Sequence, residues 1–137
     1  MVRTGFIDHI GLAVPDLAEA RSYYDELMPI LGMKQWFPTA PEFNYGPNGT
    51  LGTQLFFYEA REAATYSRHA VGLQHIGFAV ASRAIVREAH DWAGSKDPAC
   101  ILEAPQNFPQ YGTHYATYWL DPHGFKLEAV CHIEENV

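Results

Sequence analysis

Residues 9–14 alternate between bulky apolar positions and small or polar ones, the pattern of a β-strand with one buried face. The bulky positions are Ile10, Leu12 and Val14. The other face pairs His9 with two of the smallest side chains, Gly11 and Ala13. We therefore expect one face to pack under a helix and the other, with free volume beside the imidazole, to line a cavity.

The same hexapeptide recurs at residues 75–80, an offset of 66 residues from position 9 to position 75, with five of six residues identical. Its histidine is His75. Because the offset is about half of the 137-residue chain, the repeat spans the whole sequence. A unit of this size buries little apolar surface alone, so two units should pack together. The prediction is a single domain, 1–137, made of two repeats at about 5–65 and 71–133.

An amphipathic helix is predicted after each of these strands. In the first repeat Asp16 is a suitable N-cap, and an apolar stripe at helical spacing runs to Gly32. In the second repeat Ser82 is expected to cap a helix over 83–93, which Gly94 ends.

Short apolar runs broken by turn residues follow each helix. They span residues 34–37, 43–45, 54–58, 101–103, 115–120 and 125–132. Asp121 to Gly124 is predicted to form a tight turn between the last two, because Pro122 and Gly124 suit the backbone angles of such a turn. Each repeat therefore reads β-α-β-β-β, which makes the fold class α+β.

Composition excludes several kinds of partner. Nine Lys and Arg against 16 Asp and Glu give a formal charge of −7, which disfavours nucleic acid. No apolar run resembles a signal peptide or approaches the roughly 18 residues of a membrane span, so a cytoplasmic protein is expected. Cys100 and Cys131 are expected to be small core residues rather than a disulfide or a metal site.

The two repeated histidines indicate a metal site. If the repeats pack about a pseudo-twofold axis, His9 and His75 approach that axis from opposite sides, and neutral imidazoles suit a divalent metal. Glu128 alternates with the apolar Leu127 and Ala129 and can face the same cavity. Two histidines and one carboxylate leave coordination positions open, as in catalytic sites. Two other interpretations stay open, since a strand histidine is more often structural and a strand glutamate is usually exposed.

The paired His-Ile-Gly-x-Ala-Val strands, the two β-α-β-β-β units and residues 118–128, Tyr-Trp-Leu-Asp-Pro-His-Gly-Phe-Lys-Leu-Glu, resemble the vicinal oxygen chelate superfamily. Its members include glyoxalase I, extradiol dioxygenases, methylmalonyl-CoA epimerase, fosfomycin-resistance proteins and bleomycin-binding proteins. The resemblance covers nearly the whole chain and is specific for the superfamily rather than for a substrate. It implies a cup-shaped mixed β-sheet formed by the two units.

The resemblance also implies site residues and partners. It implies His9, His75 and Glu128 as ligands of a divalent metal, with Fe, Mn, Zn, Ni and Co as candidates. It implies Tyr118 as a residue that faces the site, and an ordinary strand aromatic is the other interpretation. It further implies a homodimer, with the cup formed either within one chain or by exchanged units.

Glyoxalase I and the epimerase resemble each other in having a fourth protein ligand from the last strand of the first repeat. In this chain two alternative registers of that strand are possible. Aligning it with the last strand of the second repeat nominates Glu59. Packing Leu55 and Phe57 under the helix instead turns Gln54 and Phe56 inward, because a slip of one residue reverses every side chain. We favour the second register, which makes Gln54 a weak ligand and Phe56 a pocket wall.

The residues around the predicted site favour a small, largely uncharged or aromatic substrate. Basic residues able to hold glutathione, CoA or a phosphonate are scarce, and Lys126 is the one predicted to point inward. Aromatic residues such as Trp36 gather in the strands and loops expected to wall the site. His114 shares a face with Tyr118 and is a candidate acid or base, with a solvated hairpin histidine as the other interpretation.

The leading hypothesis is a small metalloenzyme that chelates two neighbouring oxygens of its substrate and acts as a Lewis acid. The reaction is either that of a glyoxalase-like isomerase or lyase, or that of an Fe(II) ring-cleaving dioxygenase, with Tyr118 hydrogen-bonded to the developing oxyanion. One alternative is a metal-free protein that binds small molecules, as the bleomycin-binding members do. Another is a metal-binding protein that has lost its activity.

Overall fold

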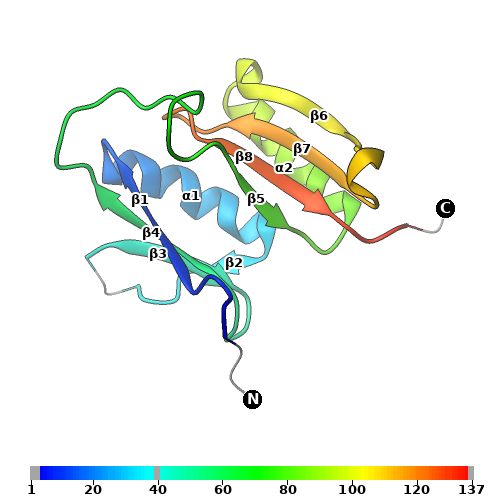
Figure 1. Cartoon of the computed structure of the whole chain (residues 1–137), viewed down its shortest axis with the longest axis horizontal. Helices are drawn as coiled ribbons and strands as arrows, with labels where there is room; N and C mark the ends of the chain where they lie inside the picture. Colours follow the sequence, from blue (N-terminus) through cyan, green and yellow to red (C-terminus); the bar gives the residue numbers. More distant parts are fainter. Residues whose placement is uncertain (1–3, 39–40, 136–137) are drawn as a thin grey trace. The chain divides into compact units, whose positions relative to one another are not determined.

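Each half of the chain builds its own sheet and helix. The computed structural model describes residues 4–38 and 41–135, and the chain divides into two units, Met1–Ala63 and Ala64–Val137. Within the described residues each unit has one α-helix and one four-stranded sheet, in the order strand, helix, strand, strand, strand (Figure 1). The predicted α+β class and the β-α-β-β-β repeat are confirmed. None of the helices in these ranges has the length and apolar character needed to cross a membrane.

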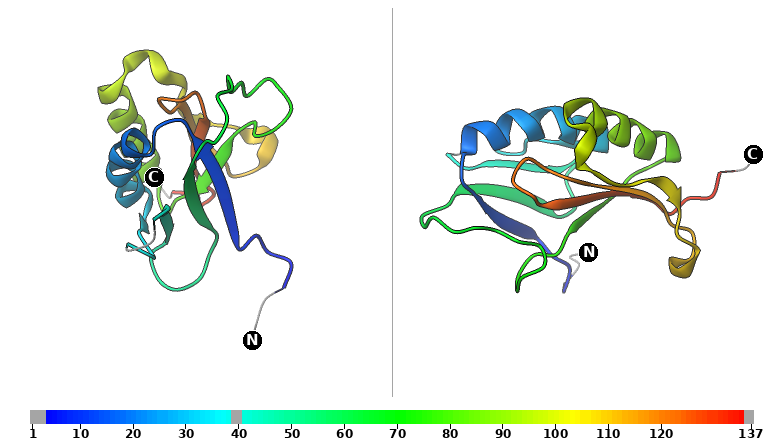
Figure 2. Two further views of the ribbon diagram at one scale, coloured as in Figure 1. Left: turned by 90° about the vertical axis from the view of Figure 1, so that its left-hand side faces the viewer. Right: turned by 90° about the horizontal axis from the view of Figure 1, so that it is seen from above.

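The first unit orders its strands β1-β4-β3-β2, with β1 parallel to β4 and the other pairs antiparallel. Its elements are β1 (His9–Val14), α1 (Leu17–Leu31), β2 (Met33–Lys34), β3 (Phe43–Pro47) and β4 (Gln54–Glu59). Helix α1 lies along one face of this sheet (Figure 2). Leu12, Val14, Leu55 and Phe57 are buried on that face, so the register favoured from the sequence is confirmed.

The second unit repeats this arrangement in the order β5-β8-β7-β6, with β5 parallel to β8. Its elements are β5 (Ile76–Ala79), α2 (Arg83–Lys96), β6 (Ile101–Asn107), β7 (Tyr115–Leu120) and β8 (Lys126–Cys131), with two short 3-10 turns, η1 (Pro98–Cys100) and η2 (Pro109–Tyr111). Helix α2 covers one face of the sheet (Figure 2). Trp119 and Leu127 are fully buried on that side.

Helix boundaries agree with the sequence at three of four ends. Asp16 caps α1 by accepting a hydrogen bond from the amide of Glu19 at 3.0 Å, and Gly32 ends it with φ of 84°. Ser82 caps α2 in the same way. The predicted end of α2 at Gly94 is wrong, because the helix runs on to Lys96. It stops where Pro98, which disfavours a helical conformation in the residue before it, leaves Asp97 extended.

Two strands also differ from prediction. The run at 34–37 forms sheet pairs only as Met33–Lys34, because the next amides donate to a side chain rather than to a strand. Strand β6 extends beyond the predicted 101–103 to Asn107, with irregular pairing to β7 along its length.

Asn44 fastens the segment after β2 to the sheet. Its side chain is fully buried, and Oδ1 accepts hydrogen bonds from the amides of Trp36 at 3.2 Å and Phe37 at 3.0 Å. Its Nδ2 donates to the Phe37 carbonyl at 3.3 Å. These backbone groups have left the sheet ladder, so the side chain replaces the strand partner they lack.

We predict that Asn44→Ala lowers the free energy of unfolding by about 1–2 kcal/mol, because it removes the acceptor of two part-buried backbone amides. Urea unfolding followed by circular dichroism measures this change. Asn48→Ala, at an exposed position, is the control and should change stability by less than about 0.5 kcal/mol. Equal effects of the two substitutions would contradict the role given to Asn44.

Candidate functional site

Glu128 is the central side chain of the candidate site in the second unit. It lies on β8 and is only 4% exposed. Its Oε1 lies 3.4 Å from His75 Nε2, and its Oε2 lies 2.7 Å from His114 Nε2. The Tyr118 hydroxyl also forms a hydrogen bond to this carboxylate. The structure therefore brings together four residues predicted from the sequence.

Strand pairing explains how these residues meet. Glu128 pairs with Gly77 on β5 and with Tyr118 on β7, so the carboxylate lies between two neighbouring strands. His75 and His114 each come one residue before their strand begins. A Cβ atom added at Gly77 would lie 2.9 Å from Glu128 Oε1, so any larger residue there would force the carboxylate to shift.

Tyr118 remains a neutral phenol in this position. Burial raises the pKa of Tyr118 above its ordinary value of 10.0, and the hydrogen bond to Glu128 and its charge raise it further. The hydroxyl is thus a hydrogen-bond donor engaged by Glu128. Its predicted bond to a substrate oxyanion stays a prediction. The ammonium of Lys126 lies 4.8 Å from the centre of the Tyr118 ring, on the same face of the sheet.

His114 is held among aromatic rings, and its side chain is 13% exposed. The ring centroid of Phe108 lies 5.9 Å from it, that of Tyr111 5.2 Å and that of His132 5.2 Å. This enclosure does not fit the alternative of a solvated hairpin histidine. Its contact with Glu128 was not expected from the sequence, because alternation placed it only relative to Tyr118. The acid or base role stays a prediction.

His9 holds the corresponding position in the first unit. It pairs with Gln54 across the β1–β4 ladder, and its ring centroid lies 5.6 Å from that of Phe56. Its Nδ1 lies 2.7 Å from Asp8 Oδ2. Gln54 Oε1 is buried and has no hydrogen-bond partner in the described part of the chain, which leaves an acceptor oxygen available beside His9. Its role as a weak ligand stays a prediction.

Aromatic rings cover the face of the first sheet opposite α1. Phe56 stacks with Phe37 at 6.3 Å and with Tyr58 at 6.5 Å between ring centroids. The Trp36 indole packs over Gly46 and comes within 2.4 Å of the position that a Cβ atom would take there. Its N–H donates a hydrogen bond to a strand carbonyl oxygen. Trp36, Gln54 and Phe56 thus lie on one face, as their predicted role in a substrate pocket requires.

Comparison of the two registers decides which residue corresponds to Glu128. Gly11 pairs with Phe56 in the first unit just as Gly77 pairs with Glu128 in the second. Phe56 therefore stands at the position of the carboxylate. The alternative alignment that nominates Glu59 is wrong, since Glu59 is exposed at the end of β4, three residues beyond Phe56. Matching the buried Leu55 to Leu127 in the sequence would have indicated this.

The structure divides the predicted ligands between its units, with His9 in the first and the other two in the second. Among residues 4–38 and 41–135, no group of three or more His, Cys, Asp or Glu side chains is arranged to hold a metal ion. Of the three predicted ligands, His75 and Glu128 are thus the two that lie close together within one unit.

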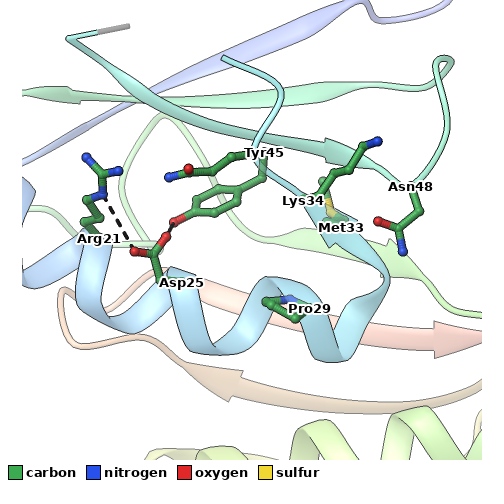
Figure 3. A pocket seen from close by; sticks show the side chains of 8 residues that line it. Arg21, Asp25, Pro29, Met33, Lys34, Tyr45 and Asn48 are labelled. Atoms are coloured by element: carbon green, nitrogen blue, oxygen red, sulfur yellow. Dashed lines mark hydrogen bonds and ion pairs between the residues drawn. The ribbon is translucent and has the colours of Figure 1, made fainter. Parts of the chain in front are cut away.

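A separate cavity of about 490 Å³ opens on the helix side of the first unit (Figure 3). The residues that line it are Arg21, Asp25, Pro29, Met33, Lys34, Gln35, Tyr45 and Asn48. The Tyr45 hydroxyl donates to Asp25 at 2.5 Å, and burial together with this bond raises the pKa of Tyr45. None of the predicted site residues lines this cavity.

We predict that Gly77→Ala destabilises the protein by about 1–3 kcal/mol, because the new methyl group collides with a carboxylate held by three partners. Gly11→Ala is the matched control. Its Cβ would meet the Tyr58 ring at 2.9 Å, but this ring is 42% exposed and free to swing aside, so the change should stay below about 1 kcal/mol. Thermal unfolding of both variants compares them, and a cost for Gly11→Ala as large as for Gly77→Ala would contradict this account.

Comparisons with known proteins agree with this geometry. The profile of the Glyoxalase/Bleomycin resistance protein/Dioxygenase superfamily matches residues 6–129. A protein from Bacillus halodurans, provisionally described as a glyoxalase, is 27% identical with a TM-score of 0.75 over 93% of this chain and 96% of that one. A glyoxalase/dioxygenase from Nostoc punctiforme is 19% identical with a TM-score of 0.71, over 98% and 97% of the two chains. No curated protein matches the sequence. The chain belongs to the Glyoxalase/Bleomycin resistance protein/Dioxygenase superfamily, which is the vicinal oxygen chelate superfamily.

Proposed function

We propose that this protein is a metal-dependent enzyme of the glyoxalase/dioxygenase type, with His9, His75 and Glu128 as the ligands of a divalent ion. The observation that carries the proposal is the His75–Glu128 pair, with Nε2 and Oε1 3.4 Å apart beside Gly77. Two ligands about 2.1 Å from one ion at a tetrahedral angle are roughly 3.4 Å apart, so this pair matches two positions of such a centre. Joining His9 to the pair is the step that the proposal adds.

The donor set suits a catalytic ion. Two imidazoles and one carboxylate supply three protein ligands and leave positions for substrate, and Fe, Mn, Zn, Ni and Co all accept such donors. When bound, the ion supplies a Lewis acid that holds two adjacent oxygens of the substrate. Phe56, at the position that corresponds to Glu128, contributes no ligand, so the predicted weak ligand Gln54 is the only donor expected from β4.

The surrounding residues orient the carboxylate and shape the pocket. His114 binds Glu128 Oε2 and so directs Oε1 toward His75. Tyr118, neutral because of its raised pKa, is a donor at the edge of the site. The aromatic layer formed by Phe37, Phe56 and Tyr58 offers flat apolar area, which favours a small, largely uncharged or aromatic substrate.

Two reaction types fit these residues: isomerisation or elimination by a glyoxalase-like lyase, and ring cleavage by an Fe(II) dioxygenase. The aromatic layer favours the second. The same layer supports a different function, a metal-free protein that binds an aromatic molecule, as bleomycin-binding members of the superfamily do. We further propose a cytoplasmic homodimer with a small-molecule substrate and no nucleic-acid or membrane partner.

Metal analysis of protein purified without a histidine tag tests the proposed ligand set. After growth with added metals we expect close to one ion per chain by plasma emission spectroscopy. His9→Ala, His75→Ala and Glu128→Ala should each lose it, because every one removes a ligand. His69→Ala, at an exposed loop position, is the control and should keep the ion. A wild-type protein without bound metal would contradict the enzyme and favour the metal-free binding protein.

The correspondence between Phe56 and Glu128 gives a second prediction. Phe56→Glu adds a carboxylate at the equivalent position, so the Kd for Zn²⁺ or Co²⁺, measured by competition with a chelator, should fall at least about tenfold. Phe37→Glu, on the neighbouring exposed ring, adds the same charge and should change the Kd much less. If the two substitutions have equal effects, Phe56 does not border the metal.

A further inference from the structure

Both repeated histidines are held by the side chain of the residue before them. His9 Nδ1 lies 2.7 Å from Asp8 Oδ2, and His75 Nδ1 contacts Gln74 Oε1. The two contacts occupy the same position in the two repeats, although the residue type differs. The sequence alone does not predict this contact, because a side chain near the start of a strand can point to either face of the sheet.

These contacts fix where each ring carries its hydrogen. A carboxylate oxygen and an amide oxygen accept hydrogen bonds and cannot donate them, so Nδ1 is the protonated nitrogen of each neutral ring. The lone pair is then on Nε2. In the second unit this same Nε2 is the atom 3.4 Å from Glu128 Oε1, so the free nitrogen points toward the candidate ligand.

The two partners differ in charge. Asp8 is a carboxylate, whereas Gln74 is a neutral amide with the same kind of acceptor oxygen. Histidines that bind metals usually donate their second N–H to a carboxylate, a carbonyl or water, and a carboxylate raises the basicity of the ring most strongly. One repeated histidine thus has a charged acceptor beside Nδ1, and the other has a neutral acceptor.

Resting on the proposed function, we infer that Asp8 and Gln74 are positioning residues that hold His9 and His75 with Nε2 free for the metal, and that the charge of Asp8 makes His9 the stronger ligand. Neither residue touches the ion. Both side chains of the His9–Asp8 pair are more than half exposed, so substitutions there should leave the fold intact.

The tautomer of each ring in the metal-free protein tests the positioning role. Long-range nitrogen–proton NMR spectra in mildly alkaline solution should show both rings with hydrogen on Nδ1. Asp8→Ala should move the His9 ring toward hydrogen on Nε2, the form favoured without a partner, and leave His75 unchanged, while Gln74→Ala should do the reverse. A wild-type His9 or His75 with hydrogen on Nε2 overturns the role of its partner. No metal takes part in this experiment, so its failure is distinct from failure of the proposed function.

Metal affinity tests the difference in ligand strength. With Co²⁺ and a competing chelator, Asp8→Asn should raise the Kd by about tenfold and Gln74→Glu should lower it by about tenfold. Glu62→Gln and Gln110→Glu make the same charge changes at exposed positions of the same two units and are the controls. Effects no larger than those of the controls overturn the assignment. A wild-type protein that binds no Co²⁺ overturns the proposed function and the ligand-strength claim together, while the NMR result still decides the positioning role.

Discussion

The structure of the second unit depends on a buried carboxylate. Glu128 is almost completely removed from solvent, and an ionised group in that position must be compensated by partners. His114 and Tyr118 supply hydrogen bonds, and His75 approaches the remaining oxygen at a distance longer than a good hydrogen bond. Oε2 thus has a close partner in His114 at 2.7 Å, whereas the distance from Oε1 to His75 Nε2 is 3.4 Å. In the proposed function, the Oε1 edge shared with His75 is where the divalent ion binds.

Duplication explains why the two halves share a backbone but differ in chemistry. In both units a strand with a histidine, a glycine and an alanine on one face pairs in parallel with the last strand of the unit. The glycine faces Glu128 in one unit and Phe56 in the other. One half therefore provides a carboxylate with its supporting donors, and the other provides an aromatic surface beside its histidine. In the proposed function, the second half supplies the carboxylate ligand and the first half supplies the apolar surface.

The sequence allowed prediction of the features that depend on local periodicity. Alternation placed Gln54 and Phe56 on the face of His9, and Asp16 and Gly32 marked the ends of α1 because caps are local. The end of α2 was misjudged because a glycine tolerates a helical conformation, and Pro98, four residues further on, ends the helix instead.

Other features depend on cross-strand register or on a single side-chain conformation, which periodicity does not define. The bond between His114 and Glu128 requires the β7–β8 pairing. The contact between His9 and Asp8 depends on the rotamers of both side chains. The correspondence of Phe56 with Glu128 could have been predicted from the sequence, but only by aligning the buried residues of the two strands rather than their similar residue types.

The central claim is that His9, from the first unit, joins His75 and Glu128 of the second unit on one ion, in one chain or in a pair with exchanged units. The most direct measurement is a crystal structure of protein loaded with Co²⁺ or Zn²⁺, with diffraction recorded on both sides of the absorption edge of the metal. We predict a single strong anomalous peak per site, within about 2.3 Å of two imidazole Nε2 atoms and one Glu128 oxygen. A peak bound elsewhere, or one that touches His75 and Glu128 while His9 lies far from it, would contradict the account.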